Sequence, residues 1–133
     1  MSLFLVIAGC AGFLILLNTV TNSIGNKGIA IINAQTAQEM INDPEVTVID
    51  VRTPGEYQGG HLKQAKLLPV AELSGRLDEI SSLKASPILV YCRSGHRSSA
   101  AARILKKAGF SKISNLSGGI TAWRDAGGAV TKK

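Results

Sequence analysis

Residues Pro87–Leu105 read PILVYCRSGHRSSAAARIL, so that an aliphatic run, a polar run and an alanine-rich run follow one another. Ile88 to Tyr91 has the length and the β-branched and aromatic content of a buried strand. A helical pattern begins near Ser98, whose hydroxyl is a typical helix N-cap. The segment between them, residues 92–97, is then a tight connection from a strand into a helix.

Cys92 stands at the end of this predicted strand, where backbone N–H groups at the start of the helix would surround it. Free N–H donors and the helix dipole both favour negative charge. A cysteine in such a cradle ionises easily, and we expect Arg93 and Arg97 to lower its pKa further. The thiolate is the nucleophilic form of cysteine. The stretch therefore predicts a reactive Cys92, although free cysteines also occur as inert core residues.

On both sides of this stretch, short β-branched runs alternate with helical patterns. Strands are predicted at residues 29–32, 46–50, 67–68, 88–91 and 112–116. Helices are predicted at residues 36–41, 70–83, 98–108 and 120–126, with an interruption at Gly75 and an end at Gly109. This alternation predicts an α/β domain with a parallel sheet covered by helices on both faces. Functional groups of such sheets gather beyond the carboxyl ends of the strands, which is where Cys92 falls.

The composition is that of one globular domain, with 133 residues of which 45% are hydrophobic and 18% are charged. Cys10 and Cys92 lie in segments of opposite character, so we expect neither a disulfide nor a cysteine-based metal site. Residues 100–133 hold seven basic side chains against Asp125 alone and account for the net charge of +6. No aromatic residues interleave with these basic side chains, so we interpret them as a solvated surface and predict no nucleic-acid partner.

The segment LFLVIAGCAGFLILLNTV, residues 3–20, is apolar and carries no charge. As a helix it would reach about 27 Å, close to the hydrocarbon thickness of a bilayer. A retained membrane anchor, a cleaved export signal leading to the periplasm, a lipoprotein signal at Cys10 and a buried core helix are the alternatives. We predict a boundary between residues 1–27, the apolar segment with its linker, and a domain at residues 28–133. The predicted localisation is membrane-anchored or exported, with the side of the membrane left open.

Three stretches, taken together, carry a family resemblance. They are IDVRTPGEYQGGHLKQAKLLP at residues 49–69, VYCRSGHRS at residues 90–98 and LSGGITAWRDAGGAV at residues 116–130. In this order they resemble the signatures of the rhodanese, or thiosulfate sulfurtransferase, family. The resemblance implies a single domain with a five-stranded parallel sheet flanked by helices. It also implies transfer of a sulfane sulfur through a cysteine persulfide, with no cofactor or metal.

Residue by residue, the resemblance makes Cys92 the nucleophile and the residues after it an active-site loop that binds the substrate. Asp50, Arg52 and Glu56 match the first signature, where we expect a charge-paired support beside the loop. The predicted substrate-binding residues are Arg93, Ser94, Gly95, His96, Arg97 and Ser98.

Other residues of the three signatures concern the surroundings of the loop. His61 and Trp123 match the family, and we interpret them as a hydrogen-bonded residue and a packing residue. Gln64 stands where a glycine is usual, and residues 128–129 replace an apolar–proline pair. These two departures bear on local turn geometry rather than on the chemistry.

The loop side chains leave alternative roles open. Arg93 and Arg97 fit recognition of a doubly charged oxyanion such as thiosulfate, whereas Arg97 is alternatively paired with a carboxylate such as Asp50 or Glu56. His96 would be the base of a Cys–His dyad, but a cysteine that is already ionised needs no base.

The predicted reaction has two steps, because Cys92 first takes the outer sulfur of a donor such as thiosulfate and an acceptor then removes it. The acceptors considered are cyanide, a thiol such as glutathione and a protein cysteine. One alternative is a non-catalytic rhodanese-like sulfur carrier or interaction module. Another is a phosphatase or arsenate reductase of the same fold. Those phosphatases use a Cys-x5-Arg loop, whereas Arg97 gives a shorter Cys-x4-Arg loop here, sized for one sulfur atom.

Overall fold

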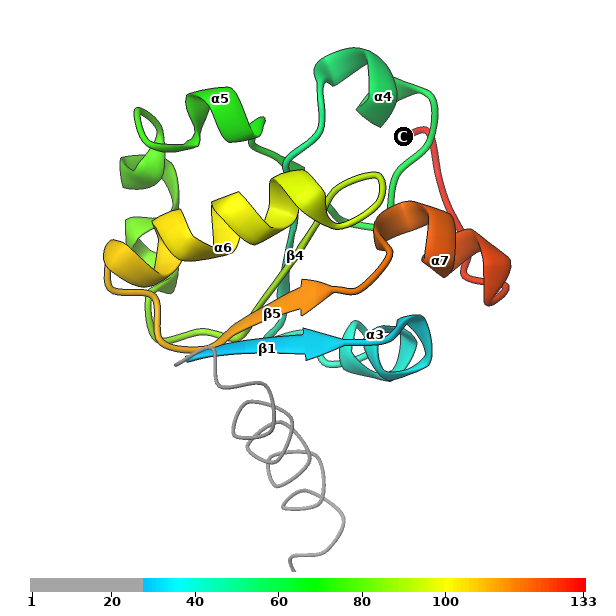
Figure 1. Ribbon diagram of the computed structural model, residues 1–133, viewed down its shortest axis with the longest axis horizontal. Coiled ribbons are helices and arrows are strands. Elements are labelled where there is room, and N and C mark those ends of the chain that lie inside the picture. The colour runs from blue at the N-terminus through cyan, green and yellow to red at the C-terminus, as the bar shows by residue number, and fades with distance from the viewer. Residues whose placement is uncertain (1–27) are drawn as a thin grey trace, which may run out of the picture.

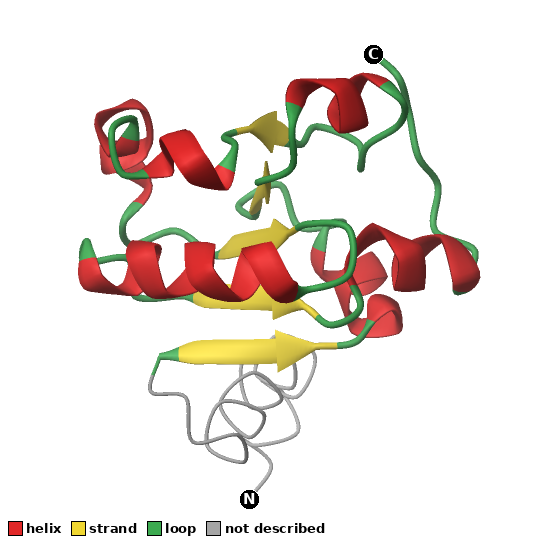
Figure 2. Ribbon diagram, turned by 45° about the horizontal axis from the view of Figure 1, so that its top comes forward, coloured by secondary structure: helices red, strands yellow, loops and turns green. Residues whose placement is uncertain are grey.

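Five short strands form one parallel sheet in the computed structural model, which describes residues 28–133. The strand order is β1-β5-β4-β2-β3, so that β4 lies at the centre of the sheet (Figures 1 and 2). All of the strand pairs are parallel, as the sequence predicted. The strands are β1 (Ile29–Ile32), β2 (Thr47–Asp50), β3 (Lys66–Leu67), β4 (Ile88–Tyr91) and β5 (Ile113–Leu116).

Helices cover both faces of this sheet and form two apolar cores with it (Figure 1). Alternate β4 residues point to opposite faces, so that Ile88 and Val90 belong to one core and Leu89 and Tyr91 to the other. The first core packs against α5 (Val70–Leu73), the 3-10 helix η1 (Leu77–Leu83) and α6 (His96–Lys107), and the second against α3 (Ala34–Met40) and α7 (Gly119–Asp125). The prediction of an α/β domain with helices on both faces is confirmed.

One helix was not predicted from the sequence, and one predicted interruption is confirmed. A short helix, α4 (Pro54–Gln58), follows β2, where no helix was predicted. Thr53 starts it with a capping box, since its side chain accepts from the Glu56 amide while Glu56 reaches back to the Thr53 amide. The predicted helix at residues 70–83 is divided into α5 and η1 around Gly75, as its interruption suggested.

The start of α6 also differs, and this difference shapes the loop after β4. The sequence predicted Ser98 as the N-cap, but α6 begins at His96 and its N-cap is Gly95. Gly95 has a φ of 107°, a left-handed conformation that favours glycine. Ser98 therefore lies inside the first turn of α6, and its hydroxyl is available for another role.

The C-terminal residues pair with a loop far away in the sequence. Thr131 and His61 form an antiparallel bridge, with both N–H to carbonyl distances at 2.8 Å. The apolar segment at residues 3–20, with its predicted boundary at residue 27, lies outside the residues that the structure describes. Among the described residues, none of the helices has the length and apolar character needed to span a membrane.

Candidate active site

Cys92 follows the last residue of the central strand, at the edge of the sheet where the carboxyl ends of the parallel strands meet. Its sulfur lies inside the turn that leads into α6. The amides of Gly95 and Ser98 donate to it at 3.1 and 3.3 Å, and the Ser98 hydroxyl oxygen lies 3.4 Å away. Only 1% of Cys92 is exposed, although it is surrounded by polar donors.

The environment of the sulfur lowers the pKa of the Cys92 thiol. Burial is the largest single influence and raises the pKa, because a thiolate loses solvation there. The hydrogen bonds of Ser98, Gly95 and Ser94 together outweigh this effect. The sequence predicted that backbone N–H groups of the loop favour the thiolate, which agrees with this result, whereas the further lowering expected from Arg93 and Arg97 is not among the largest causes of the shift. This set of donors suits a thiolate or another sulfur anion.

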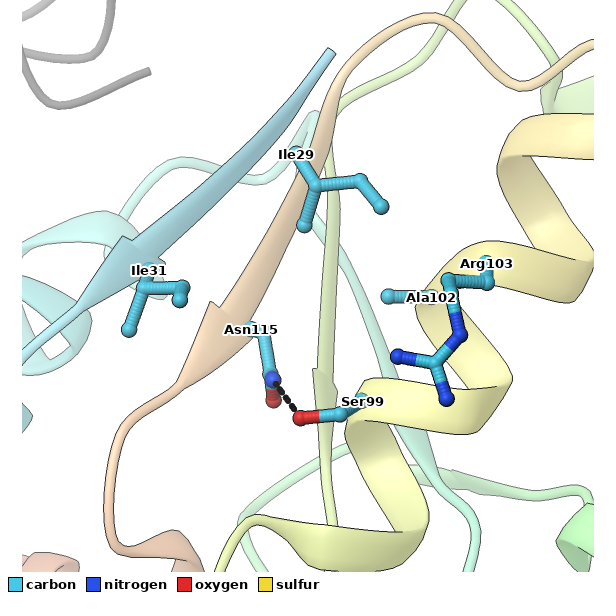
Figure 3. Close-up of a pocket in the computed structure, with 6 residues that line it drawn as sticks. All are labelled: Ile29, Ile31, Ser99, Ala102, Arg103 and Asn115. Carbon is cyan, nitrogen blue, oxygen red and sulfur yellow. Dashed lines mark hydrogen bonds between the residues drawn. The ribbon is translucent and has the colours of Figure 1, made fainter. Parts of the chain in front are cut away.

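The hydroxyl of Ser98 connects the sulfur to strand β5. Its oxygen lies 2.7 Å from Oδ1 of Asn115. The Asn115 amide on β5 also donates to Ser99 on α6, at 3.1 Å (Figure 3). Ser99 in turn donates to the Gly95 carbonyl at 2.8 Å. Asn115 is 4% exposed and was missed at the sequence level. The feature that could have identified Asn115 is a polar amide side chain in a strand whose residues are all buried, because a buried polar group needs a hydrogen-bond partner.

Strand β5 also leads into the helix that holds the other side of the loop. The amides of Ile120 and Thr121 in α7 donate to the carbonyls of Cys92 and Arg93, at 2.9 and 3.2 Å. This approach requires glycine at Gly119, because a Cβ there would overlap both carbonyl groups and because its φ is 59°. The loop is therefore clamped between α6 and α7.

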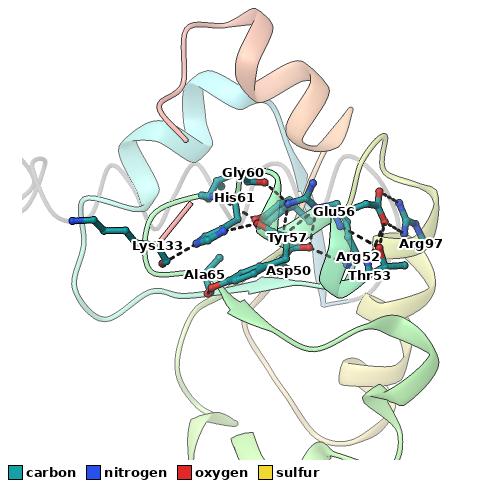
Figure 4. A network of polar contacts seen from close by, with 12 residues as sticks. Asp50, Arg52, Thr53, Glu56, Tyr57, Gly60, His61, Ala65, Arg97 and Lys133 are labelled. Atoms are coloured by element: carbon teal, nitrogen blue, oxygen red, sulfur yellow. Dashed lines mark hydrogen bonds and ion pairs between the residues drawn. The ribbon is translucent and has the colours of Figure 1, made fainter. Parts of the chain in front are cut away.

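Glu56 and Arg97 form an ion pair beside the loop (Figure 4). Two parallel contacts of 2.7 and 2.9 Å join the guanidinium to the carboxylate, and Thr53 donates to the same carboxylate. The hydrogen bond from Arg97 is the largest influence on Glu56 and lowers its pKa to about 2. Of the two roles left open for Arg97, the structure shows the pairing with Glu56.

Asp50 and Arg52 form a second pair, which is buried at the end of β2 (Figure 4). The guanidinium contacts the carboxylate at 2.7 Å and also donates to the Gly60 carbonyl at 2.7 Å. The Tyr91 hydroxyl donates to Asp50, also at 2.7 Å. The described residues leave no buried side-chain polar atom without a partner. This pair ties the first signature to the strand that carries Cys92.

The remaining predicted residues fall into two groups. Arg93, Ser94 and His96 are exposed on the loop. His61 is buried, stacks on Tyr57 with ring centroids 3.6 Å apart and contacts the Tyr57 carbonyl at 2.8 Å. Trp123 is buried and donates to the Ala129 carbonyl at 2.9 Å, which agrees with a packing role. No cluster of three or more potential metal ligands occurs within residues 28–133.

Comparisons with known proteins identify relatives of this domain. The family model for the rhodanese-like domain matches residues 33–126. An uncharacterized protein of Bacillus subtilis is 41% identical over 86 residues, which are 65% of this chain and 64% of that protein. A protein of Allochromatium vinosum named sulfurtransferase is 37% identical over 87 residues, covering 65% of this chain and 79% of that protein.

A third relative and a solved structure extend this similarity. A protein of Pseudoalteromonas translucida named thiosulfate sulfurtransferase is 33% identical over 93 residues, covering 70% of this chain and 86% of that protein. The crystal structure of a rhodanese-related protein from Thermoplasma volcanium matches with a TM-score of 0.69 at 30% identity, over 77% of this chain and 97% of that chain. The matched segments cover from 64% to 86% of the lengths of these three curated relatives.

Proposed function

This chain belongs to the rhodanese-like family, and from that membership we propose that it is a sulfurtransferase that carries a sulfane sulfur as a persulfide on Cys92, with thiosulfate as the donor. One observation carries the proposal: the Cys92 sulfur accepts two loop amides, and its pKa is lowered in spite of its burial. A site of this kind stabilises a sulfur anion before and after the transfer. The names of the relatives from Allochromatium and Pseudoalteromonas support the same class of reaction.

The first step loads the sulfur. The Cys92 thiolate attacks the outer sulfur of thiosulfate, the S–S bond of the donor breaks, and sulfite leaves with the electron pair of that bond. Loop amides that solvate the thiolate are then available to the terminal sulfur of the persulfide. Exposed Arg93 would attract the dianionic donor, while Arg97 is already paired with Glu56 and acts by holding the loop.

The second step transfers the sulfur to a thiophilic acceptor and regenerates the Cys92 thiolate. Because donor and acceptor act in turn on one sulfur, the reaction follows ping-pong kinetics. His96 has no assigned role as a base, since the thiolate forms without one. Its exposed position on the loop is compatible with contact to either substrate.

The test is the intact mass of the full chain after incubation with thiosulfate and removal of the excess donor. We expect a gain of one sulfur atom that peptide mapping places on Cys92. The variant Cys10→Ser should gain the same mass, whereas Cys92→Ser should gain none, because a serine hydroxyl stays un-ionised at neutral pH. A wild-type chain that gains no sulfur, or that gains it only on Cys10, would refute the proposal.

A further inference from the structure

A pocket of about 360 Å³ adjoins the active-site loop on the side of α7. Its lining includes three arginines, Arg52, Arg93 and Arg124, together with the single carboxylate of Glu56. Arg93 belongs to the active-site loop, and Arg124 lies in the last turn of α7. The pocket thus begins one residue after the nucleophile.

The charges around this pocket do not cancel. Arg52 is neutralised by Asp50 and Glu56 by Arg97. Arg93 and Arg124 form no ion pair with any residue of the range 28–133, and both are exposed. The pocket therefore presents two uncompensated positive charges to the solvent, and an anionic ligand is the partner that they favour.

The backbone of α7, which carries Arg124, is held against the loop. The first turn of α7 is bonded to the loop through the Ile120 amide, and Arg124 lies four residues later, on the same face of the helix. The Nη2 atom of Arg124 lies close to Gly60, at 2.8 Å from the point where a Cβ atom on that glycine would stand. The Gly60 carbonyl accepts from Arg52, so both guanidinium groups lie next to this residue.

The position of the pocket argues for a ligand that extends away from the reacting sulfur. The pocket is an open hollow beside the loop, and Cys92 is not among its lining residues. Thiosulfate has five heavy atoms, and its sulfonate group is bonded directly to the sulfur that reacts. A thiol acceptor with a carboxylate several bonds from its sulfur would instead extend from the loop into the neighbouring pocket.

We propose that this pocket binds the carboxylate of a small acceptor thiol and that Arg124 selects anionic over neutral acceptors. The inference rests on the proposed function. In the step concerned, the acceptor thiolate attacks the outer sulfur of the Cys92 persulfide, and the S–S bond to Cys92 breaks. Cys92 leaves as a thiolate, and the acceptor becomes a persulfide. No oxidant or reductant is consumed.

The experiment uses persulfidated full chain and two small thiols, mercaptosuccinate with two carboxylates and thioglycerol with none. The second-order rate of sulfur removal is measured for each thiol, and their ratio cancels general effects on the persulfide. In Arg124→Gln we expect the mercaptosuccinate-to-thioglycerol ratio to fall about fivefold, the effect of losing one exposed charge contact. Arg124→Lys should keep most of the ratio. Lys107→Gln, an equal charge loss at an exposed residue of α6 outside the pocket, should keep all of it.

The outcomes separate this inference from the proposed function. If the wild type never acquires a persulfide, the proposed function fails. If it does, but Arg124→Gln keeps the wild-type ratio, the acceptor pocket is wrong. An equal fall in the rate of loading from thiosulfate in Arg124→Gln, absent from Lys107→Gln, would assign the pocket to the donor and also overturn the inference.

Discussion

The carboxamide oxygen of Asn115 lies 2.7 Å from the hydroxyl oxygen of Ser98, the same hydroxyl that lies 3.4 Å from the Cys92 sulfur. A side chain of β5 thereby reaches the nucleophile through one residue of α6. The sheet, and not the loop alone, fixes where this hydroxyl stands. Asn115 is thus a positioning residue for the proposed reaction.

Asn115→Asp should slow sulfur loading from thiosulfate about tenfold at pH 8, because an ionised carboxylate near Ser98 disfavours a thiolate on Cys92. The measurement is the rate of persulfide formation between pH 6 and pH 9. The matched control is Asn33→Asp, the same chemical change at an exposed helix N-cap of α3, where aspartate caps equally well. A loading rate equal to that of the control would exclude a positioning role for Asn115.

Ser98→Ala should raise the pKa of the Cys92 thiol and slow its alkylation by iodoacetamide about tenfold near neutral pH, since one stabilising hydrogen bond is lost. The rate is followed against pH in a Cys10→Ser background, so that Cys92 alone reacts. Ser99→Ala removes a hydroxyl from the same network without touching the sulfur, and its pH profile should stay close to the wild type. If the pH profiles of Ser98→Ala and Ser99→Ala both coincide with that of the wild type, the Ser98 hydroxyl does not lower the pKa of Cys92. The loop amides alone would then account for the shift.

Glu56→Gln should reduce the free energy of unfolding by about 1 kcal/mol at pH 7, because the pair with Arg97 is partly exposed. Glu56 has a folded-state pKa of about 2, below its unfolded value, so the folded state binds fewer protons. Its stabilisation is therefore complete above the unfolded pKa of about 4.3 and is lost as the pH falls toward 2.

Denaturant unfolding of wild type and Glu56→Gln at several pH values from 7 down to 2.5 checks this prediction. The difference between them should shrink over the acidic part of the series. Glu39→Gln, at an exposed residue of α3 that forms no ion pair among the described residues, should differ little from the wild type throughout. A difference for Glu56→Gln that stays constant to the lowest pH would contradict the assigned pKa.

Gln64→Gly should stabilise the domain by about 0.5–1 kcal/mol, since Gln64 has a left-handed φ of 64° that costs less for glycine. This residue occupies the position where the family usually has glycine, and the backbone keeps the conformation that glycine favours. Lys63→Gly, the same change at the preceding exposed residue, should destabilise, because its φ is not left-handed. Chemical denaturation of the wild type, Gln64→Gly and Lys63→Gly measures whether each change raises or lowers the free energy of unfolding.

Gly119→Ala should cost about 2 kcal/mol or more of stability and impair sulfur loading, because the new methyl group meets the carbonyls of Cys92 and Arg93. Gly127→Ala separates the two causes of this effect. Gly127 also has a positive φ, 82°, but a Cβ there meets open space, so only the conformational cost of about 1 kcal/mol remains. If Gly119→Ala and Gly127→Ala lose the same stability and the same rate of sulfur loading, the contact between residue 119 and the loop carbonyls is unimportant.

Much of the fold could be predicted because β1 and β4 are almost fully buried and read as continuous apolar runs. The predicted segments at residues 29–32 and 88–91 coincide with β1 and β4. The start of α6 was misplaced by two residues, since Gly95 adopts a left-handed conformation that begins the helix early. Helix α4 was missed because it has only five residues, and its local signals were the capping box of Thr53 and Glu56 and a proline at its first position.

The site was predictable where it depends on neighbours in the sequence and not where it depends on packing. The cradle around Cys92 follows from a strand that turns directly into a helix. The pairing of Arg97 with Glu56 joins residues 41 apart, and either of two carboxylates was compatible with the sequence. The role of Asn115 depends on the position of β5 beside β4, which no local pattern reveals.

The strand order has a consequence for biosynthesis. In the described sheet, β1 is made first among the strands, yet its neighbour is β5, which is made last. The backbone hydrogen bonds between β1 and β5 at Ile29 therefore cannot form until Ile113 has left the ribosome. Pairings this distant in sequence are slow to close, and an apolar strand that lacks its partner is prone to aggregation. Nascent chains that stop before residue 113 lack the partner of β1, so we expect them to need chaperones more than the released chain does.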